Sequence, residues 1–99
     1  MTAQLQLNLL ETVSLQSGAH KDRSNGLCAM ELVAWVAGEP HSDHPECSCP
    51  VIAAFLRNWN DALPTDADRD RLLKPLLPLT IGTRATKEIE TRRAFLCLD

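Results

Sequence analysis

The chemistry of this chain is concentrated in one short segment. Positions 41–50 read H-S-D-H-P-E-C-S-C-P and hold two of the three histidines and two of the four cysteines. Imidazole and thiolate bind Zn²⁺ well, and the pattern H-x2-H-x2-C-x-C is a dense set of potential ligands. The two prolines, the serine and the aspartate of this segment indicate a loop, in which side chains can converge on one point. The segment therefore predicts a bound metal ion, and zinc before any other.

A structural zinc site needs four ligands, which normally come from two separate segments. We expect the second segment to be the one with His20 and Cys28, because the helix that follows should return the chain beside its own start. The predicted zinc ligands are His20, Cys28, His41, His44, Cys47 and Cys49. The alternative is a polar surface loop whose histidines cap helix ends and whose cysteines are small buried hydrophobic residues.

Glu31 is the other side chain that could take part in chemistry. It interrupts the apolar run 27–37, L-C-A-M-E-L-V-A-W-V-A, where a lone carboxylate is costly unless it is paired or binds a metal. We expect Glu31 to hold a metal-binding histidine in place or to form a salt bridge with Arg23 or Arg57. A role as the fourth metal ligand is left open.

A catalytic function competes with the structural one. Cys28 lies near the start of a helix, a position that lowers the pKa of a thiol, and His41 or His44 could act as its base. Cys28, or a zinc-bound water acting with Glu31, would make the protein a metal- or thiol-dependent hydrolase. The sequence contains no oxyanion-hole signature and no recognised nucleophile motif. We therefore favour a protein without catalysis and keep the hydrolase as the alternative.

The elements that must position these residues form an all-α domain. We expect a single domain over 1–99, a small bundle of about four helices that is stapled by the metal and has an extended N-terminal arm. The arm covers 3–16, where apolar and polar residues at first alternate and then lose the alternation, so a helix is a close alternative there. The helices are expected over 27–37, over 51–63, over 66–77 and from about residue 85 onwards. The first of them is apolar nearly all round, which is typical of a central buried helix.

Two further patterns concern the helices over 51–63 and 66–77. The first carries an apolar stripe, from which Arg57, Asn58, Asn60 and Asp61 fall away. In the second, Pro75 and Pro78 should kink or shorten the helix, and the mixed charges of 66–71 should form a solvated face.

The composition excludes several classes of function. The chain has 99 residues, 44% of them hydrophobic and 23% charged, which is ordinary for a globular protein. Its net charge of −3 gives no electrostatic case for direct binding to nucleic acid. No apolar run can span a membrane, and the N-terminus lacks the pattern of a signal peptide. We therefore expect a cytoplasmic protein with reduced thiols, although the even number of cysteines keeps disulfides as an alternative.

The C-terminal segment predicts an interaction surface. It begins with K-E-I-E-T-R-R and ends with the apolar stretch A-F-L-C-L before the final aspartate. Such a stretch packs on its own domain or on another chain. We favour a weak homodimer or a partner site formed by Phe95, Leu96 and Leu98, with packing on the same domain as the alternative.

Residues 17–51 read S-G-A-H-K-D-R-S-N-G-L-C-A-M-E-L-V-A-W-V-A-G-E-P-H-S-D-H-P-E-C-S-C-P-V. This stretch resembles a family of small uncharacterised bacterial and phage-encoded proteins, which share S-G-A-H followed by C-x-M-E-x-V-A-x-V-A-G-E-P-H-S-D-H-P. The resemblance extends over most of the chain, weakens past Gly82 and implies no activity. It singles out His20, Cys28, Glu31, His41, His44 and Cys47, and it favours Cys47 over Cys49 as a ligand.

These observations together predict a small zinc-stabilised protein that acts by binding another protein. A specific form of this prediction is a phage-type inhibitor of a larger nucleic-acid enzyme, because small acidic single-domain proteins often block such enzymes. The partner itself is not identified by any residue.

Overall fold

The computed structural model describes the backbone of residues 6–97 and the side chains of residues 6–94. Within this part of the chain every regular element is helical, which confirms the predicted all-α class. The α-helices are Leu9–Thr12 (α1), Ala29–Val36 (α2), Pro50–Ala62 (α3), Asp66–Leu73 (α4), Leu77–Thr80 (α5) and Lys87–Cys97 (α6). Two short 3-10 helices, Arg23–Asn25 and Lys74–Leu76, lie between them.

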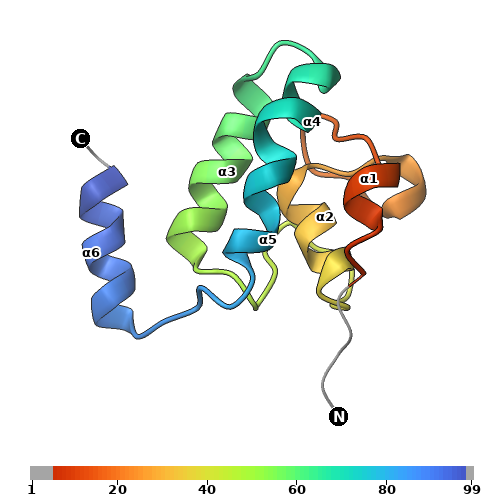
Figure 1. Cartoon of the computed structure of the whole chain (residues 1–99). Helices are drawn as coiled ribbons and strands as arrows, with labels where there is room; N and C mark the ends of the chain where they lie inside the picture. Colours follow the sequence, from red (N-terminus) through yellow and green to blue (C-terminus); the bar gives the residue numbers. More distant parts are fainter. Residues whose placement is uncertain (1–5, 98–99) are drawn as a thin grey trace.

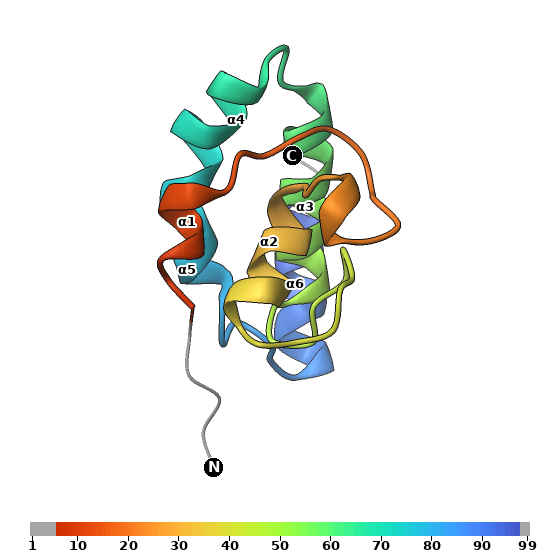
Figure 2. The ribbon, with the colours of Figure 1, turned by 90° about the vertical axis from the view of Figure 1, so that its right-hand side faces the viewer.

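Helix α2 is the centre of the fold, as its sequence predicted. Seven of its eight residues are buried, because no face of the helix is polar. Helices α1 and α5 pack on one side of α2 and α3 packs on the other, while α6 stands on the far side of α3 (Figures 1 and 2). The aliphatic side chains between these helices form one core, whose most deeply buried members are Leu15, Met30, Leu32, Val33 and Leu73.

The prolines of the third predicted helix act as expected. The segment 66–77 was predicted to be kinked or shortened, and α4 ends at Leu73, just before a 3-10 turn that contains Pro75. A new short helix, α5, then begins at Leu77 and has Pro78 in its first turn. A proline lacks an N–H and crowds the preceding turn, so the chain changes helix type at both positions.

The N-terminal arm differs from the favoured prediction and contains the helix that was the alternative. An extended segment was expected over 3–16, but Leu9–Thr12 form the short helix α1, and only the residues after it, from Val13, are extended. The three alternating leucines at 5, 7 and 9 suggested a strand, yet Leu9 is buried from within a helical turn and Leu7 is half exposed. Part of the predicted arm, residues 3–5, lies outside the described residues.

Two polar residues that were expected on the surface are buried. Asn60, in α3, was placed away from the apolar stripe, but its side chain is completely buried. It accepts a hydrogen bond from the N–H of Ala29 (3.1 Å) and donates one to the carbonyl of Gln16 (2.9 Å). Asn60 therefore satisfies the start of α2 and the loop before it, where both backbone groups would otherwise lack a partner.

Arg69 was expected on a solvated helix face but is only 6% exposed. Its guanidinium donates to the carbonyls of Asn60 and Leu63, both at 2.6 Å, and to the carboxylate of Asp66. These carbonyls belong to the C-terminal end of α3, which has no further helical turn to satisfy them. A cation at this end also interacts favourably with the helix dipole. Arg69 thus caps α3 from within α4.

Among the described residues, no helix is both long and apolar enough to span a membrane.

The buried amide of Asn60 leads to a test of this packing. We expect Asn60→Ala to lower the free energy of unfolding by about 2–4 kcal/mol, because it leaves two buried backbone groups without partners. The matched control is Asn58→Ala, which makes the same chemical change at an exposed position of the same helix and should cost less than about 0.5 kcal/mol. Urea denaturation followed by circular dichroism measures both values. Equal costs for the two variants would contradict the structural role of Asn60.

Candidate functional site

The carboxylate of Glu31 is the centre of the polar interior. Glu31 lies in the first turn of α2 and is 1% exposed. Its Oε1 accepts hydrogen bonds from the backbone N–H of Cys28 (2.8 Å) and from Nδ1 of His20 (2.9 Å). Its Oε2 accepts from the backbone N–H of His20 (2.7 Å). The carboxylate thus closes the start of α2 and at the same time holds the loop that precedes it.

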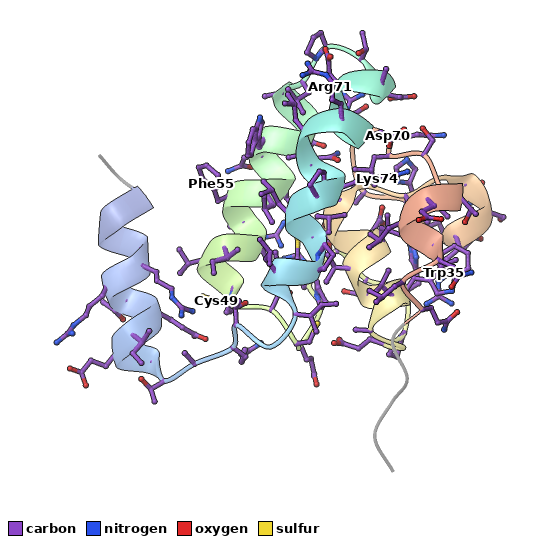
Figure 3. The ribbon with its side chains drawn as sticks, in the orientation of Figure 1. Trp35, Cys49, Phe55, Asp70, Arg71 and Lys74 are labelled. Carbon is purple, nitrogen blue, oxygen red and sulfur yellow. The ribbon has the colours of Figure 1, made fainter. Side chains whose placement is uncertain are left out.

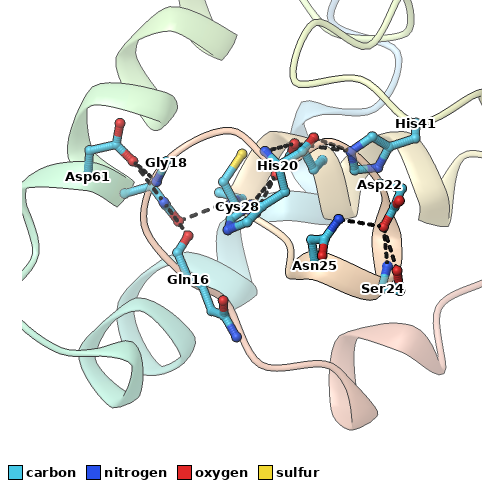
Figure 4. Close-up of polar contacts among 12 residues, drawn as sticks. Gln16, Gly18, His20, Asp22, Ser24, Asn25, Cys28, His41 and Asp61 are labelled. Atoms are coloured by element: carbon cyan, nitrogen blue, oxygen red, sulfur yellow. Dashed lines mark hydrogen bonds and ion pairs between the residues drawn. The ribbon is translucent and has the colours of Figure 1, made fainter.

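His41 adds a third chain segment to this network (Figure 4). Its Nε2 lies 2.7 Å from the carbonyl oxygen of His20 and 3.2 Å from Oε2 of Glu31. Both neighbours are acceptors, so Nε2 carries a hydrogen and donates it. The other ring nitrogen, Nδ1, is buried and has no hydrogen-bond partner among the described residues. Glu31 therefore connects the loop around His20, helix α2 and the loop that contains His41.

The electrostatics of the site keep Glu31 ionised. Burial acts to raise the pKa of its carboxyl, but the hydrogen bonds from Cys28 and His20 outweigh burial and hold the pKa below its ordinary value. The negative charge also lies at the N-terminal end of α2, which the helix dipole favours. Because both oxygens already accept hydrogen bonds, the carboxylate has little capacity to take a proton from a substrate.

The thiol of Cys28 is poorly suited to nucleophilic catalysis. Cys28 is 3% exposed, and burial raises the pKa of its thiol to about 12, with the nearby charge of Glu31 adding to the rise. The sequence predicted the opposite direction from the position of Cys28 at a helix start. A thiol must ionise to attack a substrate, so this environment disfavours a nucleophilic role.

The histidines and cysteines of the 41–49 loop point to different partners. His44 is exposed, and its Nδ1 lies 2.5 Å from the carboxylate of Asp43. The Sγ of Cys47 lies 3.8 Å from the hydroxyl of Ser48. Cys49 is buried at the N-cap of α3, where burial acts to raise the pKa of its thiol, but the helix N–H groups and the guanidinium of Arg93 together lower it.

The expected metal staple has no ligand cluster in this structure. Within the described residues, no three side chains of His, Cys, Asp or Glu are grouped so that they could hold a metal ion. His20 and His41 come together, but around a carboxylate that takes their hydrogens. The loop is closed instead by Glu39, whose carboxylate accepts from the N–H groups of Glu46 (2.7 Å) and Cys47 (3.0 Å). Zinc therefore stays a prediction without structural support.

The two arginines that were considered as partners of Glu31 are bound elsewhere. Arg23 donates to the carbonyl of Glu39 (3.0 Å) and lies over the ring of Trp35, 4.9 Å from its centroid. Arg57 donates to the carbonyl of Asp43 (2.9 Å). The predicted salt bridge of Glu31 with an arginine is therefore wrong, and the neighbours of its carboxylate are the rings of His20 and His41.

Sequence reasoning missed the residues that hold the His20 loop. Asp61 accepts a hydrogen bond from the N–H of Gly18 (2.7 Å; Figure 4). At Gly26, φ is +122°, and a Cβ there would lie 2.5 Å from the amide oxygen of Gln16 and 3.0 Å from the ring of His20. The position therefore requires glycine, both for its backbone conformation and for the close approach of His20.

No protein-family model matches the chain, and no curated protein or solved structure matches it either.

The Glu31 network leads to a prediction about stability. Glu31→Ala leaves the His20 ring and two backbone N–H groups without their acceptor, and we expect it to lower the free energy of unfolding by about 3–5 kcal/mol. Glu31→Gln keeps the shape and one acceptor oxygen, so its cost should be about 1–3 kcal/mol. Glu88→Ala, at a site that is 79% exposed, is the control and should cost less than about 0.5 kcal/mol. An Ala variant as stable as the control would show that Glu31 does not hold the fold.

The lowered pKa of Glu31 predicts how this stabilisation depends on pH. A carboxyl with a lowered pKa in the folded state stabilises the protein fully above its ordinary value of 4.5, and this contribution is lost as the pH falls through the folded-state pKa. The difference in free energy of unfolding between the wild type and Glu31→Gln should therefore be largest near neutral pH and shrink below 4.5. Urea denaturation at a series of pH values measures it. A difference that stays constant down to acid pH would contradict the charge assignment.

Proposed function

We propose that this chain is a small protein-binding module that acts without catalysis, through the side of α3 that faces α6. The observation that carries the proposal is the exposure of Phe55, 52% of which is accessible although the side chain is large and apolar. Figure 3 shows Phe55 on the α6 side of α3, away from the core around α2. Large aromatic side chains at this level of exposure are typical anchors of protein interfaces.

Phe55 lies in a hollow between the two helices, which we call the α3–α6 groove. It has a volume of about 410 Å³ and is lined by Pro50, Val51, Ala54, Phe55, Asn58 and Ala94. A second hollow of about 380 Å³ continues from it along α3, beside Phe55, Asn58 and Trp59. The ring of Trp59 packs edge-on against that of Phe55, with 6.0 Å between the centroids. A rigid aromatic pair beside an apolar hollow can bury area on binding with little loss of side-chain entropy.

The environment of Cys28 and Glu31 favours a binding function over the alternative hydrolase. The alternative, a hydrolase that uses Cys28 with Glu31, needs an ionised thiol or an available carboxylate. The Cys28 thiol is buried and has a raised pKa, and the Glu31 oxygens are occupied by hydrogen bonds. These groups stabilise the fold and are not directed at an open cleft.

The identity of the partner is the finer part of the proposal. A second copy of the chain, as a weak homodimer, and a different protein both suit an apolar groove. The predicted contact residues Phe95, Leu96 and Leu98 have side chains outside the described part of the chain. Ala94, which directly precedes them, lines the groove. Zinc stabilisation and a role as a phage-type inhibitor of a larger nucleic-acid enzyme stay more specific predictions, and no contact among the described residues supports either of them.

A charged residue in the groove tests the proposal. We expect Phe55→Asp to weaken partner binding, or self-association, at least about tenfold, as for an interface anchor. The matched control is Leu79→Asp, because Leu79 is 72% exposed on α5 and lies outside the groove. Sedimentation velocity of the purified protein measures self-association, and affinity capture followed by calorimetry measures a different partner. Melting curves of both variants establish that they fold.

Loss of association in the Phe55→Asp variant, with retention in the Leu79→Asp variant, is the expected result. If Phe55→Asp associates as tightly as the wild type, the groove is not the binding surface. If both variants lose association to the same extent, the effect is one of added charge and the proposal also fails.

A further inference from the structure

A third hollow beside α3, separate from the two described above, is lined by basic side chains. It has a volume of about 240 Å³ and lies among His44, Arg57 and Arg84, with Ser48, two prolines and Ala53 completing its wall. We call it the basic pocket. Its three basic residues come from three separate segments: the 41–49 loop, helix α3 and the linker before α6. Their convergence is notable in a chain whose net charge is −3.

Arg57 is the main source of positive charge in the basic pocket. Its one hydrogen bond within the described residues goes to the carbonyl of Asp43, which is a neutral acceptor. In the described part of the chain, no carboxylate oxygen lies within 4.0 Å of its guanidinium. Arg57 is partly buried, so its charge is less well solvated than that of a surface arginine. Arg57 therefore lines the pocket with N–H donors that have no carboxylate paired with them among the described residues.

Two carboxylates lie near the pocket, and both have other partners. Asp43 accepts from the ring of His44 at 2.5 Å. Glu90 lies 3.8 Å from Nε of Arg84 and also accepts from the N–H of Ala85 at 3.0 Å. The side chain of Arg84 is 54% exposed, so this long ion pair is weak and the guanidinium can reorient. Neither carboxylate lines the pocket.

We propose that the basic pocket binds an oxyanion of the phosphate class. Two arginines facing one small space suit a group with several acceptor oxygens, because each guanidinium can donate two parallel hydrogen bonds. The volume is below the roughly 300–1,000 Å³ of pockets that enclose a drug-sized molecule, which favours a single anionic group. This inference goes beyond the proposed function, since an anion can bind here without any protein partner.

The anion could be free phosphate or a phosphoryl group carried on a protein segment. Pro50 lines both the basic pocket and the α3–α6 groove, so the two hollows adjoin along the start of α3. A phosphorylated segment in the groove could therefore place its phosphoryl group in the pocket. The chemistry of recognition is the same for both sources, and the two probes below distinguish them.

An NMR titration tests the proposal. Inorganic phosphate, and separately a short phosphoserine peptide with an apolar residue beside the phosphoserine, are added to the ¹⁵N-labelled full chain in about 0.15 M NaCl. We expect saturable shifts of the Arg57 Nε–H and of the backbone amides of 44–48 with at least one of the probes. Binding should be at least about tenfold weaker in Arg57→Gln and in Arg84→Gln. The control is Arg92→Gln, which removes the same charge from a side chain that is 78% exposed on α6, and it should bind as the wild type does.

Arg84→Gln keeps the test decisive even if Arg57→Gln loosens the loop at Asp43, because Arg84 is exposed and holds no backbone carbonyl in the described residues. Tighter binding of the peptide than of phosphate identifies a protein-borne phosphoryl group, and equal binding identifies the free anion. Two results would overturn the proposal. One is the absence of saturable shifts with both probes, and the other is equal binding by the wild type, Arg84→Gln and Arg92→Gln.

Discussion

The buried carboxylate of Glu31 is the interaction on which the rest of the structure depends. Helix α2 is apolar on every side and can be enclosed by α1, α3 and α5, but its first turn exposes N–H groups that must find acceptors. The Glu31 carboxylate supplies one such acceptor, for the N–H of Cys28. It also accepts from the backbone and ring of His20, and Nε2 of His41 lies beside its second oxygen. One ionised group therefore joins the central helix to the loops before and after it.

Much of the fold could be predicted from the sequence because its helices have local signals. The apolar run 27–37, the proline that opens α3 and the prolines that divide α4 from α5 each act within a few residues of their own position. Asn60 and Arg69 could not be placed in this way. Their partners include Gln16, which is 44 positions from Asn60, and the end of a neighbouring helix. A polar residue at the edge of an apolar stripe gives no sign that a distant backbone group requires it.

The structure groups only some of the predicted site residues, because His44, Cys47 and Cys49 have other neighbours. His20, Cys28, Glu31 and His41 were singled out together, and the structure does bring them together. The density of histidine and cysteine indicates an affinity for metals, but it does not say which acceptor takes the imidazole hydrogens. Glu31, which was expected to support a metal-binding histidine or to pair with an arginine, is instead the central hydrogen-bond acceptor of the site. The loop backbone is satisfied by Glu39, so the cysteines beside it need not converge.

Helix α3 shows how this arrangement leaves a surface for binding. Ala53, Leu56 and Asn60 face the core and Trp59 packs against it, whereas Phe55 faces α6. The described turns of α6 are mostly charged, with Ile89 itself 44% exposed, and they provide little apolar area to cover the ring of Phe55. Because an exposed aromatic side chain gains free energy when it leaves water, this side of α3 is more stable when covered. The carboxylate of Glu31, by contrast, already has its hydrogen bonds within the fold, and for this reason we propose the outer face of α3, rather than the Glu31 site, as the surface that binds a partner.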